Sequence, residues 1–395
     1  MSQSKESRQE MLNNDERQKE KKKSTKKKRT EKEMQLLLRR IFIILGAVLL
    51  FVAVPCFLLA TDYGRLINNQ DSYTEMQSVS FGSYPQSMVS DKKTLDALSE
   101  LELEWNYFDD CFSGDDYYGT MERTDCMKYA DVEYNGSRYR AVVIDKYRPD
   151  CVLSSATAEQ SRQDDNGFEL NNVYWFLYEP IRWTIVNSAE GFMLSQSVLD
   201  AMPFNNSVYW VDRDLDKTVF NDKELSSTKY LFTPANLYKT SSVRKWLNNE
   251  FFNFAFNSEE KKDIKDTWHL TNESSEYTKY GLMGMNHDKV FLPSWKDITR
   301  LTQDKLDTLA RFVPVTDYAR CRGVDAVLRD GNYYTWYWLS TPGDGCGDVI
   351  FAYISEEIVN FDRQFFYAYS VGGIRCAACL NQSALEQLSV GGAAQ

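Results

Sequence analysis

The sequence is poor in histidine and lacks the short motifs that identify common enzymes. Only His269 and His287 occur in 395 residues, and they lie too far apart to predict a histidine metal site. A Gly-Lys-Ser phosphate loop, a Gly-x-Ser-x-Gly turn and a His-Glu-x-x-His helix are all absent. No repeat of roughly 20 to 50 residues is present, which excludes solenoids and propellers. The sequence therefore names no reaction, and its acidic residues show no spacing that marks a general acid and base.

Long hydrophobic runs are also scarce, with one exception. Residues 41–60 carry no charge, and as a helix they extend about 30 Å, the thickness of the hydrocarbon core of a bilayer. We predict a single transmembrane helix here, with the lipid bilayer as its partner. The alternative is a cleaved signal peptide, whose apolar core is usually only about 7 to 15 residues long.

Charge is distributed unevenly about this segment. Residues 1–40 hold 14 basic and 7 acidic residues, whereas the rest of the chain holds 32 basic and 50 acidic residues. Because basic flanks stay in the cytoplasm, we expect a disordered cytoplasmic head at 1–40 and an extracellular region from residue 61 onward. The protein is thus expected in the cell membrane as a single-pass protein. The acidic excess of the outer region argues against nucleic acid as a partner.

Seven of the eight cysteines follow the apolar segment, where an oxidising compartment permits disulfides. We predict Cys111 with Cys126 as a first pair and Cys346 with Cys376 as a second, although connectivity does not follow from sequence. Cys376 and Cys379 have the Cys-x-x-Cys spacing. Redox enzymes place this motif at the start of a helix, whereas here it follows two glycines and is typical of a strand. A four-cysteine zinc site would need a second close pair of cysteines, which is missing. We expect no metal site from these residues.

The outer region predicts an α+β domain at 79–382, between a stalk at 61–78 and a flexible tail at 383–395. Strands are predicted at 79–86, 129–134, 137–144, 173–177, 181–186, 191–195, 288–292, 336–339, 349–354, 358–361 and 371–380. Asn135-Gly136 favours a tight type I′ turn between two of them. Helices are predicted at 93–104, 243–256 and 259–265, with Ser242 and Ser258 as the caps of the last two, and another helix begins at Pro293-Ser294.

Six short motifs occur in an order that carries a resemblance. They are FGSYPQ at 81–86, EPIRW at 179–183, VRKWLN at 243–248, DKVFLPS at 288–294, WYWLSTPG at 336–343 and GIRCA at 373–377. As a set, they resemble a domain of unassigned role that is common in exported proteins of Gram-positive gut bacteria. Its markers are FGxYPQ, PIxW, RxWLN, DKVFLxS, WWLRSPG and GVRPA. The chain departs from them at Ser340, where the markers have Arg, and at Cys376, where they have Pro.

A more distant similarity connects the last of these motifs to a known fold. The segment GIRCAA at 373–378 is similar to the closing strand of the formylglycine-generating enzyme and sulfatase-modifying group. That resemblance implies a C-type lectin-like fold, with twisted, mostly antiparallel sheets and two or three helices. The catalytic cysteines of that group lie just upstream of this strand, and residues 361–370 contain none. The resemblance therefore extends to the fold without the reaction.

Two groups of residues are candidates for ligand binding. Trp336, Tyr337 and Trp338 offer aromatic faces for a sugar, and Arg375 offers a polar contact; the alternatives are core packing of the rings and a buried ion pair of Arg375. Strand alternation places Trp336 and Trp338 on one face. Asp109-Asp110 and Asp115-Asp116 are candidate calcium ligands, although the Glu-Pro-Asn motif of calcium-dependent lectins is missing at residues 179–181. No other cofactor is expected.

Three functions are compatible with this pattern. The first is non-catalytic binding of a glycan or another surface protein by a membrane-anchored domain of the cell surface. The second is a structural or sensory ectodomain without a small ligand. The third is a thiol-dependent enzyme on the same fold, with Cys346 or Cys379 as its thiol. The topology, the high aromatic content and the missing catalytic motifs favour the first.

Overall fold

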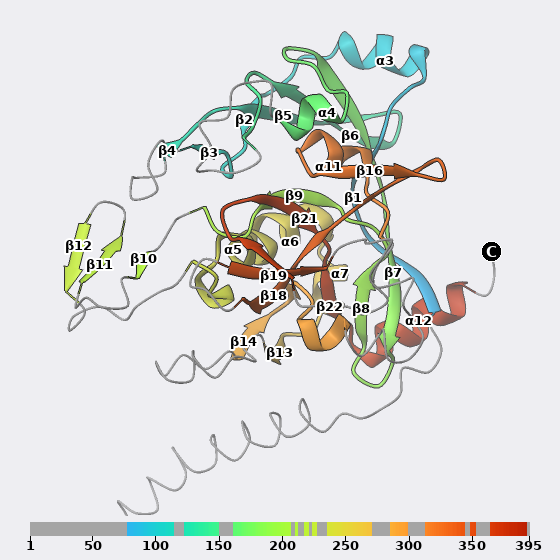
Figure 1. The fold of residues 1–395 in the computed structure, drawn as a ribbon. Helices are drawn as coiled ribbons and strands as arrows, with labels where there is room; N and C mark the ends of the chain where they lie inside the picture. The colour runs from blue at the N-terminus through green and yellow to red at the C-terminus, as the bar shows by residue number, and fades with distance from the viewer. Residues whose placement is uncertain are drawn as a thin grey trace, which may run out of the picture. The chain divides into compact units, whose positions relative to one another are not determined.

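Two mainly antiparallel sheets frame the domain in the computed structural model (Figure 1). The structure describes residues 77–113, 122–149, 161–206, 210–211, 217–220, 223–226, 235–270, 285–298, 313–343, 348–352 and 364–392. All of them belong to one unit, Asp71–Gln395. The predicted α+β class is confirmed. The predicted head, transmembrane helix and most of the stalk lie outside the described residues, and no helix among the described ones is long and apolar enough to cross a membrane.

The larger sheet has eight strands in the order β15-β22-β8-β7-β6-β5-β2, with β1 paired to β7. These are β15 (Val290–Phe291), β22 (Ala377–Cys379), β8 (Phe192–Ser195), β7 (Val173–Asn187), β6 (Ser137–Ile144), β5 (Met127–Tyr134), β2 (Asn106–Tyr107) and β1 (Gln77–Met88). The predicted hairpin is confirmed, because Asn135 and Gly136 have φ angles of 50° and 76° between β5 and β6. The strands predicted at 181–186 and 191–195 are present in β7 and β8, and they pair with each other.

Strand β7 runs unbroken through Pro180, where the sequence predicted two separate strands. Its partners explain how proline is tolerated. Pairing with β6 ends at Leu177, and pairing with β8 begins at Trp183. Pro180, which has no N–H to donate, lies between these two ladders and faces Ser83 of β1, where the register of that third pairing shifts.

The smaller sheet has the order β20-β19-β18-β21-β9. Its strands are β20 (Gln364–Tyr367), β19 (Asp348–Ala352), β18 (Tyr337–Pro342), β21 (Val371–Ile374) and β9 (Asp200–Pro203). The strand predicted at 371–380 is in fact two strands. Its first half, β21, belongs to the smaller sheet and its second half, β22, to the larger one, so the chain crosses between the sheets at Arg375 and Cys376.

Short helices and hairpins complete the described part of the chain. The helices are α3 (Lys92–Ser99), α4 (Arg162–Asp165), η3 (Tyr238–Thr240), α5 (Ser242–Trp246), the π-helix η4 (Leu247–Phe251), α6 (Phe252–Ala255), α7 (Glu260–Asp263), α11 (Asp317–Cys321) and α12 (Gln382–Gly392). The hairpins are β3 (Phe112–Ser113) with β4 (Glu122–Arg123), β10 (Trp210–Val211) with β11 (Lys217–Phe220) and β12 (Lys223–Ser226), β13 (Thr267–Leu270) with β14 (Met285–Asp288), and β16 (Ala326–Arg329) with β17 (Asn332–Thr335).

Several predicted helix boundaries are corrected. Ser241, not Ser242, caps α5 by accepting a hydrogen bond from the Arg244 amide. Asn257, not Ser258, accepts the first amides of α7. The helix predicted over 93–104 ends at Ser99. In place of the flexible tail predicted from residue 383, α12 packs against β1 and buries Ala384 and Leu385.

Candidate functional site

A cavity of about 320 Å³ lies where α5, η4 and α6 face strands β2, β5 and β6. Its lining combines ionised side chains with aromatic rings. Sixteen residues line it: Tyr84, Tyr107, Phe108, Asp109, Asp110, Tyr129, Arg140, Asp200, Met202, Asn206, Ser242, Lys245, Trp246, Glu250, Phe254 and Arg322. The cavity is thus assembled from segments far apart in the sequence.

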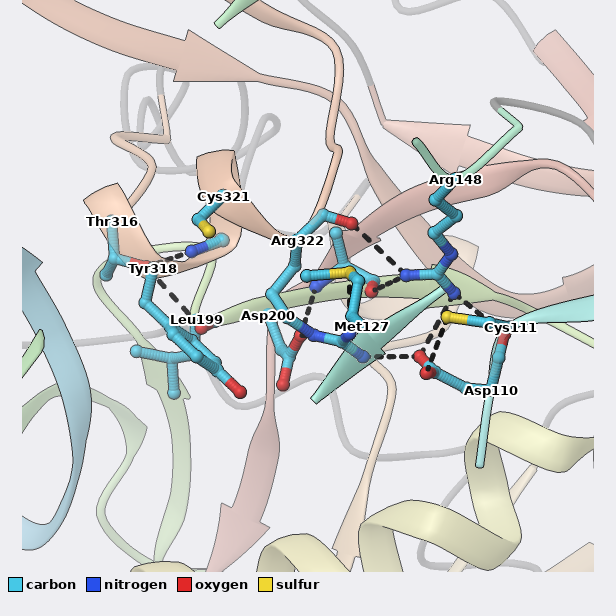
Figure 2. A network of polar contacts seen from close by, with 12 residues as sticks. Asp110, Cys111, Met127, Arg148, Leu199, Asp200, Thr316, Tyr318, Cys321 and Arg322 are labelled. Carbon is cyan, nitrogen blue, oxygen red and sulfur yellow. Dashed lines mark hydrogen bonds and ion pairs between the residues drawn. The ribbon is translucent and has the colours of Figure 1, made fainter. Parts of the chain in front are cut away.

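Arg322 is the central cation of the cavity floor. Figure 2 shows its side chain between two carboxylates: its Nε lies 2.9 Å from Asp200 Oδ1, and its Nη2 lies 2.5 Å from Asp110 Oδ2. Tyr84 donates a hydrogen bond of 2.7 Å to the other oxygen of Asp200. Burial and the Asp200 charge raise the pKa of Tyr84, so this phenol stays a donor. Arg322 is held on both sides, which fixes its orientation.

Arg148 supplies a second guanidinium to Asp110. Its Nη2 contacts Asp110 Oδ2 at 3.0 Å, and its Nη1 donates to the carbonyl oxygens of Ala201 and Arg322 (Figure 2). Burial alone would raise the pKa of Asp110, but Arg148 and Arg322 outweigh it and lower that pKa below its usual value. Asp110 is therefore ionised at neutral pH.

Arg140 forms the other side of the floor, on β6. It makes a two-pronged ion pair with Asp131 of β5, with both N–O distances at 2.8 Å. It also donates to the Tyr318 hydroxyl at 3.1 Å. Burial opposes the ionisation of Asp131, but the hydrogen bond from Arg140 outweighs it and lowers the pKa of Asp131. Every buried arginine of the floor is thus matched by carboxylate.

Aromatic rings form the cavity walls. The Arg322 guanidinium lies 3.8 Å from the centroid of Phe108, and that of Arg140 lies 4.5 Å from Tyr129 and 5.0 Å from Phe254. Such distances are typical of cation–π contacts. Tyr107, by contrast, is 41% exposed at the edge of the sheet. The walls therefore have inner rings that hold the arginines and an outer ring that is open to a ligand.

The cavity mouth carries the polar groups that the floor does not use. Glu250 lies exposed on the π-helix η4, a kind of turn that often marks functional sites. Partial burial, together with Asp109 and Asp110, raises the pKa of Glu250, which outweighs the lowering by Lys245. Asn206 presents a buried Oδ1 that has no hydrogen-bond partner among the described residues. Glu250 and Asn206 thus offer acceptor oxygens at the cavity.

A pair of thiols lies directly behind the floor. Cys111, which follows Asp110, shares a hydrogen bond with Cys126; this bond raises the pKa of Cys111 and lowers that of Cys126 to about 6. Both thiols are free in the structure, so the predicted disulfide stays a prediction. Of the second predicted pair, Cys346 lies outside the described residues. Cys376 is buried and free.

The aromatic site expected at Trp336, Tyr337 and Trp338 is corrected in favour of its alternative, core packing. Tyr337 and Trp338 are fully buried, and Gly372 packs so tightly that an added Cβ would lie 2.5 Å from both tryptophan rings. Trp336 and Trp338 do share a face, with ring centroids 4.9 Å apart. Arg375 is also fully buried: it donates from Nε to the Ser195 carbonyl and from Nη1 to the Tyr337 hydroxyl. Arg375 thus links Ser195 of the larger sheet to Tyr337 of the smaller one.

The two chemistries that sequence left open find no support at the described residues. Asp110, a candidate calcium ligand, already binds two arginines, and the described residues contain no cluster suited to a metal ion. Asp115 and Asp116 lie outside them. Burial raises the pKa of Cys379 to about 12, so its thiol is protonated at neutral pH and is a poor nucleophile.

Residues 216–382 match the model of a domain of unknown function, DUF6273. The matched segment includes Ser242, Lys245, Trp246, Glu250, Phe254 and Arg322 of the cavity, whereas the remaining lining residues precede it. Comparison with curated proteins and comparison with solved structures each gave no match.

Proposed function

We propose that the protein is a membrane-anchored cell-surface protein whose outer domain binds a glycan without catalysis. The cavity of about 320 Å³ with aromatic walls carries this proposal. Ligand sites commonly occupy clefts of about 300 to 1,000 Å³, with apolar walls and a few placed polar groups. The site differs from the one expected at Trp336 and Trp338, but the chemistry is the same: rings for the sugar faces and acceptors for the hydroxyls.

The ionisation states support binding over catalysis. The carboxyls of Asp110 and Asp131 have lowered pKa values and are engaged by arginines, so neither is poised to donate a proton near neutral pH. A glycosidase needs two carboxyls that flank the scissile bond, one of which gives up a proton.

The cellular setting of this proposal rests on the sequence. The uncharged run at 41–60 and the basic head before it support a single-pass anchor with an extracellular domain. The lectin-like fold stays part of the proposal, supported by the mainly antiparallel sheets and the small number of helices.

A matched pair of tyrosines tests the proposal. Tyr107 lines the cavity and is 41% exposed, whereas Tyr367 is 48% exposed and is not part of the lining. The full-length protein in detergent is screened on a glycan array, and affinities for the hits are measured by calorimetry. We expect Tyr107→Ala to weaken binding about tenfold, the effect of about 1.4 kcal/mol, and Tyr367→Ala to leave it unchanged.

Two results would reject the proposal. If the wild-type protein binds no glycan, the structural or sensory alternative replaces it, because the buried ion-pair network would then serve stability alone. If glycans bind and the two tyrosine variants behave alike, binding occurs elsewhere on the molecule. Circular dichroism of both variants verifies that the fold is retained.

A further inference from the structure

One edge of the β16–β17 hairpin is open among the residues that the structure describes. Strand β17 is bridged on its outer side by Pro314, which pairs with Tyr334. Strand β16 pairs with β17, and no other described strand pairs with it. Figure 1 shows this hairpin in orange, extending outward from the sheets. An unpaired edge strand offers its backbone groups to another chain, and proteins usually protect such edges.

The hydrogen bonds of β17 show which backbone groups of β16 face this edge. The Tyr333 carbonyl and the Thr335 amide are bonded to the segment 313–315, with N–O distances of 3.0 and 3.4 Å, so they point away from β16. In an antiparallel ladder, two opposite residues direct their N–H and C=O groups either toward each other or both outward. Leu328 and Ala326 stand opposite Tyr333 and Thr335, and their backbone groups therefore face the open edge.

The side chains of β16 are apolar and exposed. Val327 and Leu328 are 61% and 59% exposed, more than any other large apolar side chain among the described residues. Because neighbours along a strand point to opposite faces, both faces of β16 are open to solvent. The charged residue of the strand, Arg329, lies at the end next to the turn and leaves this apolar pair uninterrupted. A partner strand would cover both faces.

The sequence of this edge is complementary to itself. An antiparallel copy centred on Val327 places Val327 opposite its own counterpart and Ala326 opposite Leu328, so the outward backbone groups meet. In the same register, Asp325 of each copy stands opposite Arg329 of the other, and these side chains are 42% and 40% exposed. The next register that lets the backbone groups meet, centred on Leu328, pairs no opposite charges. Cross-strand charge pairs thus favour the first register.

We propose that the protein associates with a second copy of itself through β16, as a twofold-symmetric pair of antiparallel strands centred on Val327. The strand lies outside the cavity lining, so the contact is separate from the glycan site. Two strands of four residues bury less than about 1,200 Å², the lower limit of a stable soluble interface, and the pair is weak. Many copies on one membrane would favour it, because tethering raises the local concentration. That setting rests on the proposed anchor, whereas the contact itself does not.

Cysteine cross-linking traps a weak contact and reports its register. In a non-hydrogen-bonded antiparallel pair the two Cα atoms are about 4.5 Å apart, within the range of a disulfide. Val327→Cys should therefore form a covalent dimer in cells that express the full-length protein. Added diamide is the oxidant, which takes up the two electrons and two protons that the thiols lose. A blot without reductant measures the dimer, and the wild-type protein gives the background from native cysteines.

Leu328→Cys is the matched control, because the two positions are similarly exposed. In the proposed register, Leu328 and its counterpart lie diagonally across the strands, at about 7 to 8 Å, which is too far for a disulfide. We expect Val327→Cys to cross-link about tenfold faster than Leu328→Cys, since random collisions would treat both thiols alike.

Charge reversal tests the complementarity. In the Val327→Cys protein, Asp325→Lys or Arg329→Glu alone should slow cross-linking about fivefold, because each sets like charges opposite each other. The two changes together restore opposite charges and should restore the rate. Circular dichroism of the purified variants verifies that the fold is retained.

The outcomes separate this inference from the proposed function. If Val327→Cys and Leu328→Cys cross-link equally, self-association through β16 is rejected, while glycan binding is decided by the Tyr107 variant. If Leu328→Cys cross-links faster, or the double charge variant stays as slow as the single ones, the pairing of Asp325 with Arg329 is wrong and the proposal falls. Diamide crosses membranes, so these results do not depend on the side that the domain faces.

Discussion

Asp110 is the carboxylate on which two buried guanidiniums depend. Arg148 and Arg322 both reach it, and their own side chains are almost fully buried. A buried ion pair is expensive to form, but removing one partner is more expensive, since it leaves a charge without compensation. The ion pairs of Asp110 with Arg148 and Arg322 thus hold the floor of the cavity in one arrangement.

We expect Asp110→Asn to lower the free energy of unfolding by about 3 to 5 kcal/mol. Asparagine keeps the size of the side chain but removes the carboxylate that Arg148 contacts and leaves Arg322 with Asp200. Asp325→Asn is the control, because Asp325 pairs with Arg162 at 3.4 Å with both side chains about 40% exposed, and such pairs contribute less than about 1 kcal/mol. Urea unfolding of each full-length variant measures both values; equal effects would contradict the role assigned to Asp110.

The same pair gives an acid dependence with a definite sign. The folded-state pKa of Asp110 is lowered, so the unfolded chain binds more protons and this group stabilises the fold above its unfolded pKa of about 3.9. That contribution is lost as the pH falls through the lowered folded pKa. The unfolding free energies of the wild type and of Asp110→Asn should therefore converge as the pH falls below about 4. A difference that stays constant as the pH falls well below about 4 would show that folding does not lower the pKa of Asp110.

The sequence could point to Asp110 but not to its partners. Adjacent aspartates are visible as a local pattern, and the natural interpretation of such a pattern is a cation ligand. Arg148 and Arg322, however, lie 38 and 212 positions away, and nothing in their neighbourhoods sets them apart from surface arginines. Asn206 and Glu250 were missed for the same reason. The candidate site is a product of tertiary structure.

At the scale of elements, the sequence predicted the features that depend on neighbouring residues alone. The turn at Asn135-Gly136 was predicted because both positions need positive φ, and only a few residues adopt it readily. The break at Arg375 was not, because residues 371–380 are uniformly buried and an apolar run does not show which sheet it joins. Helix α12 was missed because Ala384 and Leu385 gain their stability from packing rather than from helix propensity.

The hairpin of β3 and β4 permits a test of the predicted Cys111–Cys126 disulfide. Its strands bring the two cysteines to the same end, with the Thr124 amide donating to the Cys111 carbonyl at 2.9 Å. In an oxidising compartment we expect the bond to form and, for a loop of roughly 15 residues, to stabilise the domain by about 3 kcal/mol. Peptide mapping without reductant, and melting temperatures with and without dithiothreitol, measure both.

Cys126→Ala separates the disulfide from other effects of the reductant. The variant should melt at the same temperature with and without dithiothreitol, whereas the wild type should melt lower with it. If both thiols of the wild-type protein, isolated from cells without reductant, react with a label after unfolding, the pair is not oxidised. The two cysteines would then be linked by their hydrogen bond and not by a disulfide.

At the scale of the molecule, the α+β class followed from the alternation of predicted strands and helices, while the position of the site did not. The aromatic motif at 336–338 looked like a surface because exposed and buried rings have the same sequence signature. The fold buries Tyr337 and Trp338 in the smaller sheet and opens the cavity elsewhere, where segments from residue 84 to residue 322 meet. Patterns along the sequence predict the fold class, whereas a pocket forms only when segments far apart in the sequence pack together.

The last prediction concerns the orientation of the chain in the membrane, which follows from the charges of residues 1–40. With 14 basic residues in the first 40, we expect the N-terminus inside and the acidic domain outside. Protease added to intact cells should remove a C-terminal tag and spare an N-terminal one, and lysed cells should lose both. Replacing the seven basic residues of 21–29 with glutamine should weaken this asymmetry.

A protected C-terminal tag would contradict the outward topology, and release of the domain into the medium without its N-terminal tag would indicate a cleaved signal peptide. The outcome also bears on the thiols behind the cavity floor. Only on the outer side would Cys111 and Cys126 meet an oxidising environment and join covalently. Orientation in the membrane thus determines whether the wall of the pocket that carries Asp109 and Asp110 is held by a hydrogen bond or by a disulfide.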